Sequence, residues 1–271
     1  MMTTTVNIIS AGVRKVDGGS MFGTVPKAEW QGSVLPDRQN RITLGLNCML
    51  LRTCGKTVLI DTGGGATANE SLGLVPNRLS KNLRGFGVIP KSIDIVILSN
   101  LHFDHCGGAI RLDRVGSIVP TFPNARYYVQ SVLWEEACHP KERYVAVPVA
   151  EHFQPLVERG QWELMDGDTE IIPGLQVIVP GGHPKGHQIV RFIHGGERIA
   201  FLGDLVPTPY HLKLSVIPAF DFSPQITLAQ KQEVLAQAER EGWLLVFAHG
   251  YDTKAGYLQR GKRAYLRSVD L

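Results

Sequence analysis

Three side chains that commonly bind metal ions stand within four residues in the segment Asn100-Leu101-His102-Phe103-Asp104-His105. It follows an apolar run over residues 93–99, which is typical of a buried strand, and it precedes a Cys-Gly-Gly-Ala turn over residues 106–109. Two imidazoles and a carboxylate within four residues are more polarity than a core accommodates without partners. We therefore interpret the segment as a metal-binding loop. The alternative is a polar loop with solvated histidines.

The spacing Asn-x-His-x-Asp-His resembles the His-x-His-x-Asp-His signature of the metallo-β-lactamase superfamily, with Asn100 in place of the first histidine. Four further motifs of that family, one before residues 100–105 and three after them, are matched in the family's order along the chain. Their key residues are Asp61, His183, Asp204 and His249. The resemblance covers roughly residues 5–255. It implies an α/β protein with a four-layer αβ/βα sandwich, the metallo-β-lactamase fold, and a single domain over residues 1–271.

The resemblance also implies a role for each of these residues. Asn100, His102 and His183 would surround a first metal ion, and Asp104, His105 and His249 would surround a second, with Asp204 between them. Asp61 would support the site without ligating a metal ion. Imidazole and carboxylate ligands suit zinc, with manganese or iron as further choices. Two ions about 3.5–4 Å apart can hold a hydroxide that attacks a carbonyl. Asp104 would orient this hydroxide and pass its proton to the leaving group.

Asn100 is the departure from the family pattern. A neutral amide oxygen is a weaker zinc ligand than imidazole, so the first site should be weakened while the second keeps its side chains. Three outcomes are open: two ions with Asn100 as a weak or water-mediated ligand, one ion only, or lost activity. Because the other ligand positions are filled, we expect a working site with two ions or mixed occupancy.

The composition is that of an ordinary globular protein. Of the 271 residues, 44% are hydrophobic and 20% are charged, and the net charge of +3 argues against nucleic acid as a partner. The four cysteines include no Cys-x-x-Cys pair, which favours a reducing compartment. The N-terminus lacks a basic region followed by an apolar stretch, and no apolar run reaches membrane-spanning length. We expect a cytoplasmic protein with a small-molecule substrate and no membrane partner.

Two segments are candidates for substrate contacts. Residues 17–41 are rich in Gly and Pro but carry scattered apolar side chains, among them Met21 and Phe22. We interpret this segment as an irregular lid or pocket wall; the alternatives are a loop that covers one sheet or a homodimer contact. The loop after Asp204 should face the pocket, so Tyr210 or His211 could touch the substrate. His187 follows the His183 motif, and we expect it to be structural.

The third motif resembles that of the acyl-homoserine lactone lactonases. Those lactonases carry a tyrosine three residues after the bridging aspartate, whereas this chain has Pro207 there, which weakens a specific assignment. We therefore expect a hydrolase that cleaves a lactone or a carboxylic ester. The alternatives are a β-lactam or phosphotriester hydrolase of the same fold, or a catalytically impaired metal-binding protein.

Strands should dominate the first third of the chain, with a hairpin whose turn is at residues 53–55. We expect strands over residues 6–13, 44–52, 56–60 and 91–99, and helices over residues 67–85, around 148–159, and over 227–242. Ser131 should cap a further helix.

Overall fold

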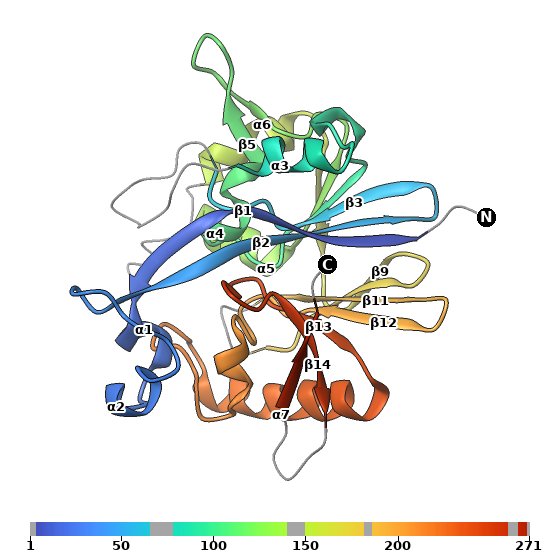
Figure 1. The fold of residues 1–271 in the computed structure, drawn as a ribbon. Helices are drawn as coiled ribbons and strands as arrows, with labels where there is room; N and C mark the ends of the chain where they lie inside the picture. Colours follow the sequence, from blue (N-terminus) through green and yellow to red (C-terminus); the bar gives the residue numbers. More distant parts are fainter. Residues whose placement is uncertain (1–3, 66–77, 140–149, 182–185, 260–264, 270–271) are drawn as a thin grey trace.

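The computed structural model describes residues 4–65, 78–139, 150–181, 186–259 and 265–269. Two mixed β-sheets form the middle of the molecule (Figure 1). The first sheet has, in spatial order, β1 (Thr5–Asp17), β2 (Arg41–Thr53), β3 (Lys56–Ile60), β4 (Ile95–Ile97), β7 (Arg126–Gln130) and β8 (Trp162–Met165). The second has β15 (Tyr265–Ser268), β14 (Ala255–Gln259), β13 (Leu244–Val246), β12 (Glu197–Phe201), β11 (Ile189–His194), β10 (Leu175–Ile178) and β9 (Thr169–Ile172).

Helices cover the outer face of each sheet. The first sheet carries α3 (Leu79–Gly85), α5 (Ser131–Cys138) and α6 (Gln154–Glu158), and the second carries α7 (Pro224–Glu241) (Figure 1). A separate apolar core fills the space between the sheets. The molecule therefore has four layers, and the expected αβ/βα sandwich is confirmed.

The alternation along β2 shows why the first sheet is buried on both faces. Leu46, Cys48 and Leu50 belong to the core beneath the helices, whereas Met49 and Leu51 belong to the core between the sheets. Successive side chains of a strand point to opposite faces, so a continuous apolar run fits a central strand. The β2–β3 hairpin is also confirmed, with its turn at Cys54 and Gly55, which both have positive φ (50° and 71°).

Several element bounds differ from those expected. The strand predicted over residues 91–99 is shorter, because the 3₁₀ helix η2 (Pro90–Ser92) precedes β4. Helix α7 begins at Pro224, three residues before the predicted start, since proline suits the first turn of a helix. It ends at Glu241, and the next residue, Gly242, has the left-handed conformation (φ 69°) that terminates helices.

Other predicted helices fall partly outside the described residues. Of the helix predicted over 67–85, only α3 is described, and the one around 148–159 divides into η4 (Ala150–Phe153) and α6. The remaining short elements are α4 (Phe103–Cys106), η3 (Gly107–Ala109), β5 (Ile110–Leu112), β6 (Ile118–Pro120) and η5 (Pro209–Leu212). Among the described residues, no helix is long and apolar enough to cross a bilayer.

The segment over residues 17–41 is only partly irregular. Strand β1 continues to Asp17, opposite Arg41 of β2, and two short helices follow, α1 (Gly18–Phe22) and α2 (Lys27–Trp30). The rings of Phe22 and Trp30 stack with centroids 4.7 Å apart. With Met21, they form a small apolar core against β2. The helices are too short to give a periodic sequence signal.

Candidate metal centre and active site

The candidate residues meet at one edge of the sandwich. Asp61 follows β3, the loop over residues 99–106 follows β4, Asp204 follows β12 and His249 follows β13. Strand β3 is parallel to β4, and β12 is parallel to β13. The carboxyl ends of parallel strands lie at the same edge of a sheet, where open α/β sheets commonly bind ligands. The topology therefore brings together side chains that are up to 188 residues apart in the sequence, from Asp61 to His249.

His105 is oriented by Asp61. The Nδ1 atom of His105 lies 2.7 Å from Oδ2 of Asp61, whose carboxylate also accepts hydrogen bonds from the backbone N–H and the hydroxyl of Ser99 (2.7 and 2.8 Å). A carboxylate can only accept, so Nδ1 of His105 carries the hydrogen. Its Nε2 is therefore directed into the site, at 3.2 Å from Oδ2 of Asp204.

His249 is oriented in the same way by the backbone. Its Nδ1 donates to the carbonyl of Gly45 across 2.9 Å, which leaves Nε2 facing the site. This atom lies 3.2 Å from Oδ1 of Asp204 and 3.5 Å from Oδ2 of Asp104. Gly45 has to be glycine here, because a Cβ would lie 2.5 Å from the carbonyl oxygen of Gly250.

The Nε2 atoms of His105 and His249 are 3.1 Å apart. Two imidazole lone pairs at this distance repel each other unless a cation or a proton lies between them. Burial lowers the pKa of His105, but the carboxylates of Asp204 and Asp61 outweigh burial and raise its pKa well above the ordinary value. Ligand atoms of Asp104, His105 and His249 lie within 4.8 Å of one another, and all three residues are buried. This donor set fits a zinc, iron or manganese ion.

Asn100 is buried and engaged at both ends of its amide. Its Oδ1 accepts a hydrogen bond from the backbone N–H of His102 at 2.7 Å, and its Nδ2 lies 3.1 Å from Oδ2 of Asp204. The backbone donor fixes which end of the amide is the oxygen. The amide nitrogen, which has no lone pair to offer, is consequently the end that faces Asp204.

Two other predicted ligands differ in how they are placed. His102 lies nearby, with Nδ1 3.6 Å from Oδ2 of Asp204. His183 lies outside the described residues. His187 is buried, and its Nε2 accepts the backbone N–H of Asp204 at 2.9 Å, so it holds the loop that carries this carboxylate.

Arg14 is a site residue that sequence reasoning missed. Its Nη1 lies 2.7 Å from Oδ2 of Asp104. Burial alone would raise the pKa of Asp104, but its electrostatic interactions, the largest of them with the guanidinium of Arg14, lower the pKa below the usual range. Asp104 is therefore a carboxylate. Arg14 belongs to β1, 90 residues before Asp104, and no local pattern connects them.

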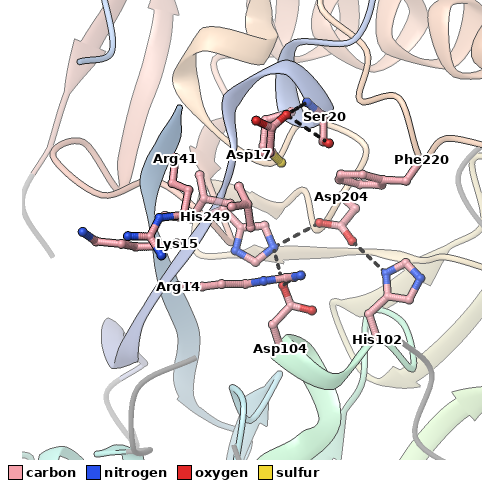
Figure 2. Close-up of a pocket in the computed structure, with 13 residues that line it drawn as sticks. Arg14, Lys15, Asp17, Ser20, Arg41, His102, Asp104, Asp204, Phe220 and His249 are labelled. Carbon is pink, nitrogen blue, oxygen red and sulfur yellow. Dashed lines mark hydrogen bonds and ion pairs between the residues drawn. The ribbon is translucent and has the colours of Figure 1, made fainter. Parts of the chain in front are cut away.

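A cavity of about 390 Å³ opens above these residues. Figure 2 shows His102, Asp104, Asp204 and His249 at its floor, with basic side chains along one side. A second cavity of about 390 Å³ adjoins the first, because Leu44 and His249 line both.

The predicted substrate-contact residues are placed differently from one another. Met21 lines the first cavity and Tyr210 lines the second. Phe22 packs on Trp30 in the core beside β2. His211 is buried: its Nε2 donates to the carbonyl of Met21 at 2.9 Å, and its Nδ1 accepts from the hydroxyl of Thr208 at 2.7 Å. Burial lowers the pKa of His211 to about 3, so it is a neutral link between η5 and α1.

Comparison with known proteins agrees with this geometry. An N-acyl homoserine lactonase of Bacillus thuringiensis is 25% identical over 225 residues, which cover 77% of this chain and 82% of that protein. The N-acyl homoserine lactonase of Bacillus cereus is 24% identical over 233 residues, with coverages of 80% and 86%.

Solved structures share the fold. A probable metal-dependent hydrolase from Staphylococcus aureus has a TM-score of 0.85 at 24% identity, and the comparison covers 99% of this chain and 98% of that one. A dizinc quorum-quenching lactonase in complex with a product has a TM-score of 0.79 at 19% identity, with coverages of 99% and 94%.

The sequence model of the metallo-β-lactamase superfamily matches residues 42–249. This range is most of the chain and contains every candidate ligand. The two sheets and the outer helices agree with the fold of the solved structures. The chain belongs to the metallo-β-lactamase superfamily and is a metal-dependent hydrolase.

Proposed function

We propose that this protein hydrolyses a lactone or a carboxylic ester. The observation that carries the proposal is the pair of Nε2 atoms of His105 and His249, 3.1 Å apart and flanked by two buried carboxylates at the floor of an open cavity. The sequence relatives named as N-acyl homoserine lactonases support an acyl substrate. Pro207 stands where those lactonases have a tyrosine, so we propose lactones and esters in general and no particular lactone.

We propose that Asp104, His105 and His249 hold the more tightly bound ion, with Asp204 beside it. His102, Asp204 and, beyond the described residues, His183 would hold a weaker one. Asn100 would act through Asp204 and not as a ligand, because its oxygen is occupied by the backbone N–H of His102. A bound divalent ion would polarise the scissile carbonyl and lower the pKa of a water molecule.

The chain's own residues would position the reactants. Because the carboxyl of Asp104 is ionised, it can accept a proton from the attacking water and return it to the leaving oxygen. Arg14, at 2.7 Å from Oδ2, would fix the rotamer of Asp104. Asp61 and the carbonyl of Gly45 would keep the two imidazoles in the tautomer that directs Nε2 into the site.

The test is turnover on a panel of lactones and esters before and after chelation. We expect chelation to abolish turnover, zinc or manganese to restore it, and Asp104→Ala to remove it by two orders of magnitude or more, as is typical when a general base is lost (about 10²–10⁴-fold). Lys81→Gln, an exposed residue on α3, is the matched control. If chelation changes the melting temperature only, the protein is a metal-binding protein without this activity.

A further inference from the structure

Three basic side chains line one side of the cavity above the candidate metal centre: Arg14, Lys15 and Arg41 (Figure 2). They belong to two strands of one hairpin, in which Arg14 pairs with Leu44 and Arg41 pairs with Asp17. Their side chains are 25%, 48% and 42% exposed, so each is open to the cavity or its rim. The whole chain has a net charge of only +3, so this gathering of cations on one cavity is local.

The carboxylates that face these cations are already engaged. A single one, Asp37, is shared by Lys15 (3.5 Å) and Arg41 (2.8 Å). The carboxylate of Asp17 accepts hydrogen bonds from the backbone N–H of Ser20 and from Nδ2 of Asn40. The cavity lining also contains the carboxylates of Asp17, Asp104 and Asp204, so the wall becomes net positive only when metal ions compensate the charges of Asp104 and Asp204.

Arg14 has donors to spare. Its Nη1 contacts Asp104 and its Nε is buried, but a quarter of the side chain is exposed, so other N–H groups of the guanidinium remain accessible from the cavity. A guanidinium has five N–H donors in a planar fork that matches a carboxylate. When Asp104 and Asp204 serve as metal ligands, the ions compensate their charges, and the repulsion that they would exert on an anion in the cavity falls.

The neighbouring cavity differs in character. Its lining includes Leu35, Ile42, Tyr210 and Tyr251, and Leu35 and Tyr251 are 87% and 53% exposed. Large apolar side chains at the mouth of a cavity favour an apolar group on the ligand. His249 and Leu44 line both cavities, so the metal centre lies between a basic side and an apolar side.

We propose that the substrate is anionic: a lactone or ester that carries a carboxylate, which Arg14, Lys15 and Arg41 bind, while an apolar part of the molecule lies in the second cavity. The proposal rests on the proposed lactone or ester hydrolysis and specifies its substrate class. The reaction adds water across the acyl C–O bond and needs no further co-reactant. The three cations act on specificity and take no part in bond breaking.

The direct test compares two γ-lactones that differ only in one substituent, a carboxylate in the first and the neutral carboxamide in the second. We expect kcat/KM of the metal-loaded enzyme to be about tenfold higher for the carboxylate, mainly through KM, because these contacts bind ground state and transition state alike. Arg41→Gln and Lys15→Gln should each reduce this preference severalfold, by raising KM for the carboxylate more than KM for the carboxamide. High salt should also reduce the preference for the carboxylate, because Lys15 and Arg41 are about half exposed and their charges are screened. Lys81→Gln should change neither.

A binding measurement separates this proposal from the activity. Glutarate, a non-hydrolysable dicarboxylate, is titrated calorimetrically into the metal-loaded wild type, Arg41→Gln and Lys81→Gln. Weaker binding to Arg41→Gln alone supports the anion site even if neither lactone is hydrolysed, in which case only the proposed reaction fails. Equal glutarate affinity in all three proteins, or a carboxamide that is hydrolysed as well as the carboxylate, overturns the proposal.

Discussion

The amide of Asn100 links the backbone of the metal-binding loop to the carboxylate of Asp204. Its oxygen accepts the N–H of His102 at 2.7 Å, and its nitrogen lies 3.1 Å from Oδ2 of Asp204. Asn100 stands where the family motif has a histidine ligand, but its amide forms hydrogen bonds that link two other parts of the site.

This relationship predicts the effect of Asn100→His. An imidazole offers a lone pair where the amide offers an N–H, so the number of ions per chain should rise, measured by elemental analysis of protein purified without chelator. Asn100→Ala removes the amide without adding a ligand and should not raise it. An unchanged count in Asn100→His would show that Asn100 does not limit occupancy of the first site.

Asp61→Ala should weaken metal binding without touching a proposed ligand. Without the carboxylate, Nδ1 of His105 keeps only the hydroxyl of Ser99, at 3.1 Å, and the preference of the ring for one tautomer weakens. Loss of such a partner costs roughly 10–100-fold in metal affinity. Competition with a chromogenic chelator measures this. Ser99→Ala removes the hydroxyl contacts to Asp61 and to Nδ1 of His105 but keeps the carboxylate, and it should have a smaller effect. Equal affinities in Asp61→Ala and wild type would contradict the role proposed for Asp61.

Gly45→Ala should destabilise the protein and its metal site together. The added methyl would lie 2.5 Å from the backbone oxygen of Gly250, and the carbonyl of Gly45 holds His249. We expect a loss of about 1–3 kcal/mol in the free energy of unfolding, the usual cost of overpacking, together with weaker zinc binding. Gly32→Ala is the control, because a Cβ there would meet nothing within 4 Å. Equal unfolding midpoints for the two variants would refute the steric argument.

His211 should make stability depend on pH. Its pKa is about 3 in the folded protein, because burial opposes its charge, and its ordinary value is 6.5. Between these values the unfolded chain binds more protons than the folded one, so the free energy of unfolding rises with pH and is lost as the pH falls below 6.5. The slope from this group is at most about 1.4 kcal/mol per pH unit.

Denaturant unfolding of chelated protein between pH 4.5 and 6.5 would measure this contribution. We expect a shallower pH dependence in His211→Gln than in wild type, and an unchanged one in His194→Gln, whose side chain is exposed. A wild-type slope in His211→Gln would mean that His211 is already charged in the folded state.

The residues with local signals were predictable from sequence. The apolar run before Asn100 and the polar cluster after it predicted a strand ending in a metal-binding loop, and the four layers were expected from the family that the motifs resemble. Arg14 and Gly45 could not be predicted in this way. Their partners, Asp104 and His249, lie 90 and 204 residues away, and only the packing of the two sheets brings them together.

The position of His249 in the chain has a consequence for how the protein acquires its metal. His105 and His249 are 144 residues apart, and His249 follows β13, near the end of the sequence. During synthesis the first sheet leaves the ribosome long before this strand does. An ion held by Asp104, His105 and His249 would therefore be captured only after residue 249 has been synthesised, and a transcript with a premature stop before codon 249 would yield a chain that lacks this ligand.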